Sequence, residues 1–365
     1  MSRLIIIGLF LFPFHVFAKV NSAALYRVYN DGATQVESPK LEVGSSFLKD
    51  RLNVNLGFAQ DVISSASSDV VSYSSRDVIT DKRTEGSGTL SYNMDDGNVG
   101  WSYVRSQEND YTSDIFSFAG TRDFFEKNTT FFASFSYGED RISTSKDPDN
   151  KHLMTHESFS LALTQVLSRL SLVQLLADIR LEQGYLSSPY RLARLHNQNS
   201  SGTVIGVPEN HPLTRNRYAM TFKYNYFFTH LKLSTSSSLR LYNDNWGVKS
   251  GTLEERVSRK FTPKFELTLQ GRYYKQTKAD FYEDIYDSLG PFFTGNKTLA
   301  NMSAYLVGLR PTYNFTDEIN FYTKYEYYRI NYENHTALGK LLDASDDKLL
   351  DLTAHILGVG IEGSF

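Results

Sequence analysis

Segments in which apolar and polar residues alternate recur along this 365-residue chain, and they constrain its fold more than any other feature. In one segment, Val173, Leu175, Ala177 and Ile179 alternate with Gln174, Leu176, Asp178 and Arg180. Successive side chains of a β-strand point to opposite faces, so this period of two predicts strands with one apolar and one polar face. The alternation continues for ten residues or more, which favours membrane-spanning strands over the shorter strands of a soluble sandwich or propeller.

The connections between these segments alternate between short and long. Short ones lie near residues 49–50, 95–98, 123–127, 167–169, 227–229, 260–263 and 314–318. Longer ones lie near residues 31–38, 62–82, 109–111, 139–152, 184–211, 243–246, 277–297 and 332–348. Bacterial outer-membrane barrels have this sidedness, with short turns in the periplasm and longer loops outside. The sequence therefore predicts an all-β fold, a transmembrane antiparallel up-and-down β-barrel of about 16 strands, over residues 19–365.

Both ends of the chain favour export to the outer membrane of a Gram-negative bacterium. Arg3, the apolar run of residues 4–12 and the small residue Ala18 have the pattern of a signal peptide, predicted as residues 1–18. The last residue, Phe365, ends a strand-like segment and resembles the terminal signal read by the barrel assembly machinery. We expect it to end the closing strand, against the first strand near residues 22–30.

The composition supports a barrel and excludes several classes of function. The chain contains 24 Tyr and 25 Phe but only 2 Trp, and its mean hydropathy is −0.37. A barrel reconciles these values, because its lumen is polar while its lipid-facing band is narrow and rich in aromatic residues. The net charge of −3 gives no nucleic-acid footprint, and the absence of cysteine excludes disulfides, iron–sulfur ligation and covalent haem in this chain.

Several stretches resemble an uncharacterised family of bacterial outer-membrane β-barrel proteins, a domain of unknown function. They lie at residues 61–67, 108–113, 163–168, 184–191, 208–217, 242–247 and 272–282, and the element Tyr185-Leu186-x-x-Pro189-Tyr190-Arg191 is the most specific of them. The resemblance covers nearly the whole mature chain and implies the barrel fold without an established activity. Some relatives are encoded near flavin-attaching enzymes and small lipoproteins, which implies a link to an envelope redox system.

The alternation predicts which charged side chains face the lumen, since burying them against lipid costs a few kcal/mol each near the midplane. These lumen and selectivity candidates are Asp178, Arg180, Glu182, Lys223, Lys232, Arg240, Glu266, Arg272, Arg310, Lys324 and Glu326. Two interpretations stay open: a selectivity ring of mixed sign around a pore, or a salt-bridged interior that keeps the shape of the barrel and conducts nothing.

The loop motif Pro189, Tyr190 and Arg191 is a candidate for a constriction or a ligand contact. We favour the simpler interpretation that Pro189 and Tyr190 pin the loop while Arg191 bonds at the rim. We predict no metal site and no cofactor. His152 and His156 are four residues apart, a spacing that aligns metal ligands on a helix and not on a strand.

These patterns predict a porin-like channel or conduit for small solutes and not an enzyme, because no catalytic constellation can be nominated. The expected partners are outer-membrane lipid and the barrel assembly machinery, with no nucleic acid. The alternative is a non-conducting barrel scaffold of an envelope redox or export complex, with a periplasmic lipoprotein or flavoprotein as partner.

Overall fold

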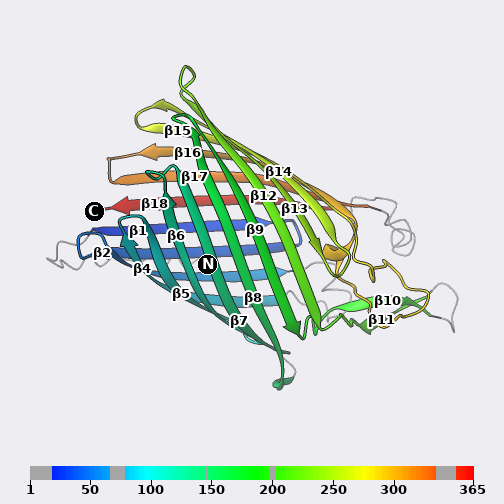
Figure 1. Cartoon of the computed structure of the whole chain (residues 1–365). Helices are drawn as coiled ribbons and strands as arrows, with labels where there is room; N and C mark the ends of the chain where they lie inside the picture. Colours follow the sequence, from blue (N-terminus) through cyan, green and yellow to red (C-terminus); the bar gives the residue numbers. More distant parts are fainter. Residues whose placement is uncertain (1–18, 66–78, 145–146, 198–202, 334–350) are drawn as a thin grey trace, which may run out of the picture.

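The structure is a computed structural model that describes residues 19–65, 79–144, 147–197, 203–333 and 351–365. Sixteen antiparallel strands form one closed barrel, in the order β1-β18-β17-β16-β15-β14-β13-β12-β9-β8-β7-β6-β5-β4-β3-β2 (Figure 1). The predicted fold class and strand number are confirmed. The predicted signal peptide, residues 1–18, lies outside the described residues.

Nine strands form the first part of the barrel wall: β1 (Val20–Asn30), β2 (Thr34–Phe47), β3 (Leu52–Ser65), β4 (Ile79–Met94), β5 (Gly97–Gln107), β6 (Tyr111–Phe124), β7 (Thr129–Thr144), β8 (Asp147–Ser168) and β9 (Ser171–Gly184). Seven more complete it: β12 (Thr214–Phe228), β13 (Leu233–Asp244), β14 (Lys249–Thr262), β15 (Phe265–Gln276), β16 (Met302–Asn314), β17 (Ile319–Tyr332) and β18 (Leu352–Ser364).

The first and last strands of the wall close the barrel. β1 pairs with β18 from Asn21↔Ser364 to Asn30↔His355. Beyond that ladder, the Val20 amide donates to the Phe365 carbonyl and the Phe365 amide donates to the Val20 carbonyl, both at 2.8 Å. Phe365 therefore ends the closing strand as expected, although its direct partner is Val20, just before the predicted residues 22–30. Closure leaves the wall without a free edge, so its backbone polar groups are paired without water.

The two ends of the barrel differ in the length of their connections. At the turn end, where Phe365 lies, short turns join β2 to β3, β4 to β5, β6 to β7, β8 to β9, β12 to β13, β14 to β15 and β16 to β17. At the opposite end, which we call the loop end, four connections are long, at residues 66–78, 185–213, 277–301 and 333–351. The connections β1–β2, β5–β6, β7–β8 and β13–β14 at this end are as short as those of the turn end. The alternation of short turns with mostly longer loops was predicted, but the loops expected at residues 31–38 and 139–152 are wrong. β2 begins already at Thr34 and pairs with β1. β7 and β8 stay paired out to Thr144↔Asp147, because their backbone ladder continues through polar residues that resemble a turn.

One face of the wall carries large apolar side chains that remain exposed. Leu56, Phe116, Val307 and Leu357 are between 52% and 63% exposed. Aromatic rings on neighbouring strands pair on this face, as in Tyr103 and Phe116, whose centroids are 4.8 Å apart. A soluble monomer rarely exposes an apolar surface of this extent, whereas a lipid-facing band requires one.

The longest connections fold into a small structure at the loop end, which we call the cap: residues 185–197, 203–213, 245–248 and 277–301. It contains the hairpin β10 (Leu192–His196) and β11 (Val204–Pro208) and the 3₁₀ turn η1 (Lys297–Leu299). The hairpin lies beyond the loop end of the wall (Figure 1). Bridges Leu195↔Tyr286 and Asn210↔Phe293 join the two long connections. No helix in the described ranges is long and apolar enough to cross a membrane.

The cap has a hydrophobic core of its own. Trp246, Val248, Ala279, Tyr282 and Leu299 are each at most 5% exposed, and they pack with Ala300. Tyr242 of β13 and Tyr332 of β17 pack against this cluster. The cap is therefore fixed to the wall on the β13–β17 side.

We predict that the terminal residue stabilises the closed barrel through its backbone. Deleting Phe365 removes its two hydrogen bonds to Val20, at a net cost of about 0.5–1.5 kcal/mol each, because Val20 is exposed at the end of the barrel. When both proteins are titrated with urea in detergent micelles, the deletion variant should therefore have a lower unfolding midpoint than wild type.

The matched control is Phe365→Asp, which keeps the backbone and changes only a side chain that is 63% exposed. It should refold with a midpoint close to that of wild type. A deletion variant as stable as Phe365→Asp would show that the Val20–Phe365 pair does not contribute to closure.

Candidate functional site

The structure places ten of the eleven predicted lumen charges on the polar face of the wall, opposite the exposed apolar residues. Their strands are β9 for Asp178, Arg180 and Glu182, β12 for Lys223, β13 for Arg240, β15 for Glu266 and Arg272, β16 for Arg310, and β17 for Lys324 and Glu326. The placement of Lys232 was wrong. It lies in the turn before β13, with a φ of 49°, because the turn continues to Lys232 and the strand begins only at Leu233.

Most of these charges are paired along the wall. The Arg240 Nη1 atom is 2.7 Å from Asp178 Oδ2, two strands away. Lys324 Nζ is 2.7 Å from Glu326 on the same strand, and Arg310 Nη2 is 3.6 Å from Glu362 of β18. Each of these pairs joins strands that are at most two apart in the barrel. The cations keep about two fifths of their surface exposed: 40% for Arg240, 38% for Lys324 and 39% for Arg310.

A polar pocket of about 530 Å³ lies on this face at the loop end, between the walls of β4–β9 and the start of the cap. Its lining residues are mostly charged or hydroxyl-bearing, and they include Arg83, Glu85, Ser106, Glu108, Asp110, Tyr111, Ser113, Asp140, His156, Arg180, Ser187 and Tyr190. This polar face is the lumen face, since the opposite face of the same strands carries the exposed apolar side chains. The pocket is our candidate functional site.

Two buried titratable groups form part of the pocket wall. Asp140 of β7 and His156 of β8 are 2% and 3% exposed, and His156 Nε2 is 3.9 Å from Asp140 Oδ2. Asp140 Oδ1 and His156 Nδ1 have no hydrogen-bond partner in the described part of the chain. The imidazole lies on Gly138, where a Cβ atom would be 2.1 Å from the ring, so this position requires glycine. Buried polar atoms without partners are rare, and here they face a pocket that admits polar molecules.

A third buried titratable group lies next to this pair. Glu182 of β9 is 5% exposed, and it accepts a hydrogen bond from Arg180 Nε at 2.8 Å while Arg217 Nη2 of β12 is 2.7 Å away. The guanidinium of Arg180 also lines the pocket. The pocket lining therefore joins the predicted residue Arg180 to Asp140 and His156, which we did not nominate as lumen residues. Arg217, which contacts Glu182 behind the lining, was not nominated either.

The predicted histidine positions do not form a metal site in the described residues. His152 stacks on Tyr185 with ring centroids 4.2 Å apart, while His156 lies beside Asp140. No group of three or more His, Cys, Asp or Glu side chains in the described ranges is arranged to hold a metal ion.

The loop motif forms the roof of the pocket. The Tyr190 hydroxyl donates to Asp110, in the connection between β5 and β6, although the ring remains 54% exposed. The Arg191 Nη1 atom is 3.9 Å from Glu209 Oε1 of the cap. Pro189 and Tyr190 both line the pocket. The motif thus makes contacts at the rim, as a loop-pinning role requires, and also borders the space available to a solute.

A buried hydrogen-bond network, which we call the cap latch, joins the two long connections. Thr294 is fully buried; its hydroxyl donates to Glu209 Oε2 at 2.9 Å and lies 2.8 Å from His211 Nε2. The His211 Nδ1 atom is 2.8 Å from the Leu186 carbonyl, and the Ser188 amide donates to Glu209 Oε1 at 2.6 Å. The latch holds the pocket roof in place, because Leu186 directly precedes Ser187 of the pocket lining and Ser188 directly follows it.

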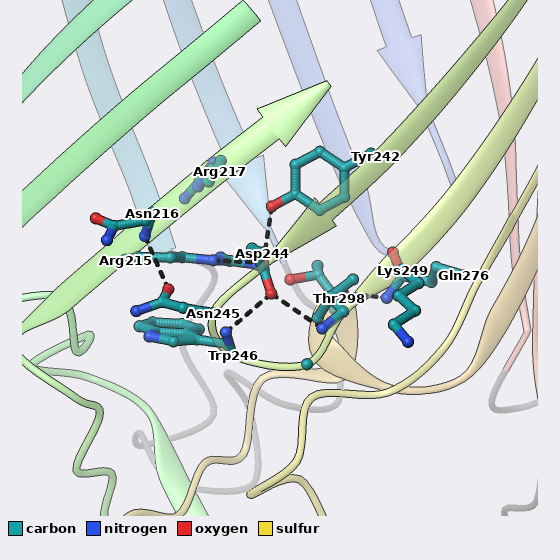
Figure 2. Close-up of polar contacts among 12 residues, drawn as sticks. Arg215, Asn216, Arg217, Tyr242, Asp244, Asn245, Trp246, Lys249, Gln276 and Thr298 are labelled. Atoms are coloured by element: carbon teal, nitrogen blue, oxygen red, sulfur yellow. Dashed lines mark hydrogen bonds and ion pairs between the residues drawn. The ribbon is translucent and has the colours of Figure 1, made fainter. Parts of the chain in front are cut away.

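The short connection between β13 and β14 is organised by Asp244 (Figure 2). Its Oδ2 atom accepts from Arg215 Nη2 at 2.6 Å and from the Tyr242 hydroxyl at 2.7 Å. Its Oδ1 atom accepts from the backbone amides of Trp246 at 3.0 Å and Val248 at 2.9 Å. Arg215 also stacks over the Trp246 ring, 4.3 Å from its centroid. Arg215 Nε also donates to Oδ2 at 2.9 Å, so the buried carboxylate has five donors and its negative charge is compensated.

This turn also holds the connection between β15 and β16. Gly247 has a φ of +86°, and a Cβ atom there would be 2.1 Å from Asp280 Oδ1. The Asp280 amide donates to the Trp246 carbonyl at 2.8 Å. Gln276 Nε2 donates to the carbonyls of Thr298 and Ala300, both at 2.8 Å. The 242–247 stretch that carries the family resemblance is thus a structural anchor of the cap.

The comparisons with known proteins agree with this geometry. A family model described as "Protein of unknown function (DUF3570)" matches residues 69–346, about three quarters of the chain. The chain belongs to this family. The resemblance noted from the sequence is therefore confirmed. None of the curated proteins matches the chain.

Among solved structures, the chain is similar to a bacterial polysaccharide outer membrane secretin, with 9% identity and a TM-score of 0.55 over 96% of this chain and 99% of that one. It is also similar to CdiB from Acinetobacter baumannii, with 9% identity and a TM-score of 0.54 over 95% of this chain and 60% of that one. OmpT of Vibrio cholerae has 10% identity and a TM-score of 0.49 over 95% and 97%. At such identities the similarity shows the fold alone, that of bacterial outer-membrane β-barrels.

We predict that acid loosens the cap through Glu209. Burial alone would raise the pKa of Glu209, but the hydrogen bond and charge of His211, with the Ser188 amide, hold its pKa below the ordinary value of 4.5. A lowered pKa in the folded state means that Glu209 stabilises the cap fully above its unfolded pKa and loses this effect as pH falls through the folded pKa. The cap should therefore open in acid, below about pH 4.5.

The fluorescence of Trp246 can report this transition once Trp101, an exposed residue of the apolar face, is replaced by Phe. Emission should shift to longer wavelength as the pH falls through this range. Glu209→Gln should shift the emission already at neutral pH and remove the transition, whereas Glu318→Gln, in an exposed turn, should retain it. An unchanged acid transition in Glu209→Gln would contradict the assignment.

Proposed function

We propose that this chain resides in the outer membrane, with its loop end outside the cell, and passes small polar solutes through a water-filled lumen. The exposed apolar face and the fold of outer-membrane barrels support the location. The predicted signal peptide and the terminal aromatic residue agree with it. Since β1 begins and β18 ends at the turn end, the short turns lie in the periplasm.

The observation that carries the proposal is the way the lumen charges are paired. A salt-bridged plug requires ion pairs that cross the lumen, with their side chains buried. In the described residues, the ion pairs of the predicted lumen charges run along the wall instead, and Arg240, Arg310 and Lys324 keep about 40% of their surface exposed. Barrels of about 16 strands enclose more space than their own side chains fill. Both points favour a wet interior lined by charges of both signs.

The cap and the polar pocket support selection of small solutes. The hydrophobic core of the cap packs on the β13–β17 side, whereas its residues 187–190 roof the pocket on the β4–β9 side. Solute therefore enters through this pocket. The pocket offers Arg83 and Arg180 together with Glu85, Glu108 and Asp110, and several hydroxyl groups. Such a lining favours polar molecules that donate and accept hydrogen bonds over apolar ones.

We predict that the purified protein gives stable ohmic current steps in a planar lipid bilayer. Reversing one lumen charge, Arg240→Glu, should raise the preference for cations several-fold. The reason is that the Coulomb energy between a passing ion and a unit charge about 5 Å away in water is roughly 1 kcal/mol. The shift should shrink at high salt, since the Debye length is about 10 Å at 0.1 M and about 3 Å at 1 M.

The matched control is Arg240→Lys, which keeps the charge facing Asp178 and should keep the ion preference. A second control, Lys264→Glu, makes the same charge change in an exposed turn and should have a smaller effect. A silent bilayer for correctly folded protein would contradict the conduit. Such a result, together with a periplasmic protein that co-purifies with the barrel, would support a non-conducting scaffold.

A further inference from the structure

The apolar outer face of the barrel contains a groove of about 920 Å³ near the loop end, outside the lumen. It extends over β9 and β12–β15, and its outward-facing lining includes Ala177, Met220, Leu241, Lys249, Gly251 and Lys275. None of these residues belongs to the polar pocket or to the lumen charges. The groove therefore needs an explanation of its own.

The groove exists because a row of outward-facing residues contains small side chains. In the strand register, Ala177 pairs with Met220, Met220 with Leu241, Leu241 with Gly251, and Gly251 with Lys275. An ideal Cβ atom at Gly251 would have no neighbour within 4 Å. The row thus has a hollow at Gly251 beside the side chain of Leu241.

The side of this hollow toward the mid-plane is apolar. The next row toward the turn end consists of Leu239, Leu253 and Tyr273, which are 45%, 50% and 50% exposed and pair in register. These side chains continue the lipid-facing band below Gly251. A chain of methylene groups that enters the hollow would therefore contact apolar surface along its length.

The side toward the loop end is polar and basic. There Lys249 pairs in register with Asn243, and its backbone amide donates to the Thr277 hydroxyl oxygen at 2.9 Å. The Lys249 ammonium has no ion-pair partner in the described residues. Lys275 is 59% exposed and has one acidic neighbour, Glu333, at 3.1 Å. Two amines therefore lie at the polar rim of an apolar groove, with one nearby carboxylate.

We propose that this groove binds a phosphorylated, acylated glycolipid of the outer leaflet, the lipid A part of lipopolysaccharide. Its phosphate contacts Lys249 and Lys275 at the rim, and one acyl chain occupies the hollow at Gly251. The inference rests on the proposed function only through the orientation of the barrel, which places the loop end in the outer leaflet. The order of the groove, basic toward the loop end and apolar toward the mid-plane, matches the order of headgroup and acyl chain in that leaflet.

Native mass spectrometry of the full-length protein in detergent, titrated with bisphosphorylated lipid A, tests the proposal. The double variant Lys249→Gln with Lys275→Gln should bind lipid A roughly ten- to thirty-fold more weakly, since each basic residue near a membrane surface contributes on the order of a few-fold in affinity for anionic lipid. The control, Arg259→Gln, changes a basic residue near the turn end of the same strand, and it should leave the affinity unchanged.

Filling the hollow gives an independent test. Gly251→Leu should weaken lipid A binding because the side chain occupies the space of the acyl chain. Gly271→Leu adds the same side chain at another open position of β15 outside the groove, where a Cβ atom also meets nothing within 4 Å, and should have no effect. Both variants keep the backbone and the lumen intact, so their conductance should equal that of wild type.

Three results would overturn the proposal: unchanged affinity in the double lysine variant, unchanged affinity in Gly251→Leu, or equal binding of dephosphorylated lipid A. Equal affinity for phosphatidylglycerol would also overturn it, since the groove would then bind any anionic lipid. Failure of the conduit is a separate outcome. A silent bilayer with intact lipid A binding refutes conduction and leaves the groove, whereas conduction without lipid A binding refutes the groove alone.

Discussion

Hydrogen bonds between the first and last strands are the interaction on which the rest of the structure depends. β1 and β18 are separated by more than 300 residues of chain, yet they pair along their whole length and end in the reciprocal Val20–Phe365 bonds. An unpaired amide or carbonyl in lipid costs several kcal/mol, so an open edge of this length would not persist in a membrane. Closure gives the barrel an inside and an outside, so that one face of each strand meets the lumen and the other meets lipid.

One alternating pattern of residues gives the two faces of the wall different side chains. On the outer face, exposed leucine and aromatic side chains form an apolar surface that is interrupted by the hollow at Gly251. On the lumen face, charged residues pair with neighbours on the same wall and retain contact with water. The cap adds a third environment, in which Asp244 and the Glu209–Thr294 pair are buried because backbone amides and basic side chains compensate them. The proposed conduit and the proposed lipid groove thus occupy opposite faces of the same strands.

The sequence predicted the wall better than it predicted the site. Strand number, turn positions and the faces of residues such as Asp178 and Arg240 follow from the period of two, which is a local property of each strand. The errors arose where local patterns mislead. Polar residues at 139–152 resemble a loop but continue the β7–β8 ladder, and Lys232 follows a leucine yet still belongs to the turn.

The pocket could not be predicted because it depends on contacts between distant parts of the chain. Tyr190 reaches Asp110 from a connection 80 residues away, and Arg217 of β12 reaches Glu182 of β9. Asp140 and His156 lie on the neighbouring strands β7 and β8, but their contact depends on a register that periodicity alone does not fix. Periodicity does not identify such partners. The loop motif of residues 185–191 gave the only sequence indication, since its resemblance to the family singled out the segment that forms the roof.

Under the proposed function, a single pleated wall separates a wet lumen from lipid, and the cysteine-free chain allows this separation to be measured directly. Single cysteines at Ser238, Leu239, Arg240 and Leu241 on β13 can be tested with a membrane-impermeant thiol reagent in lipid vesicles. The account predicts rapid labelling at positions 238 and 240 and protection at 239 and 241. Protection of all four positions would show a filled lumen, and labelling of all four would show that β13 does not face lipid; either result would contradict the account.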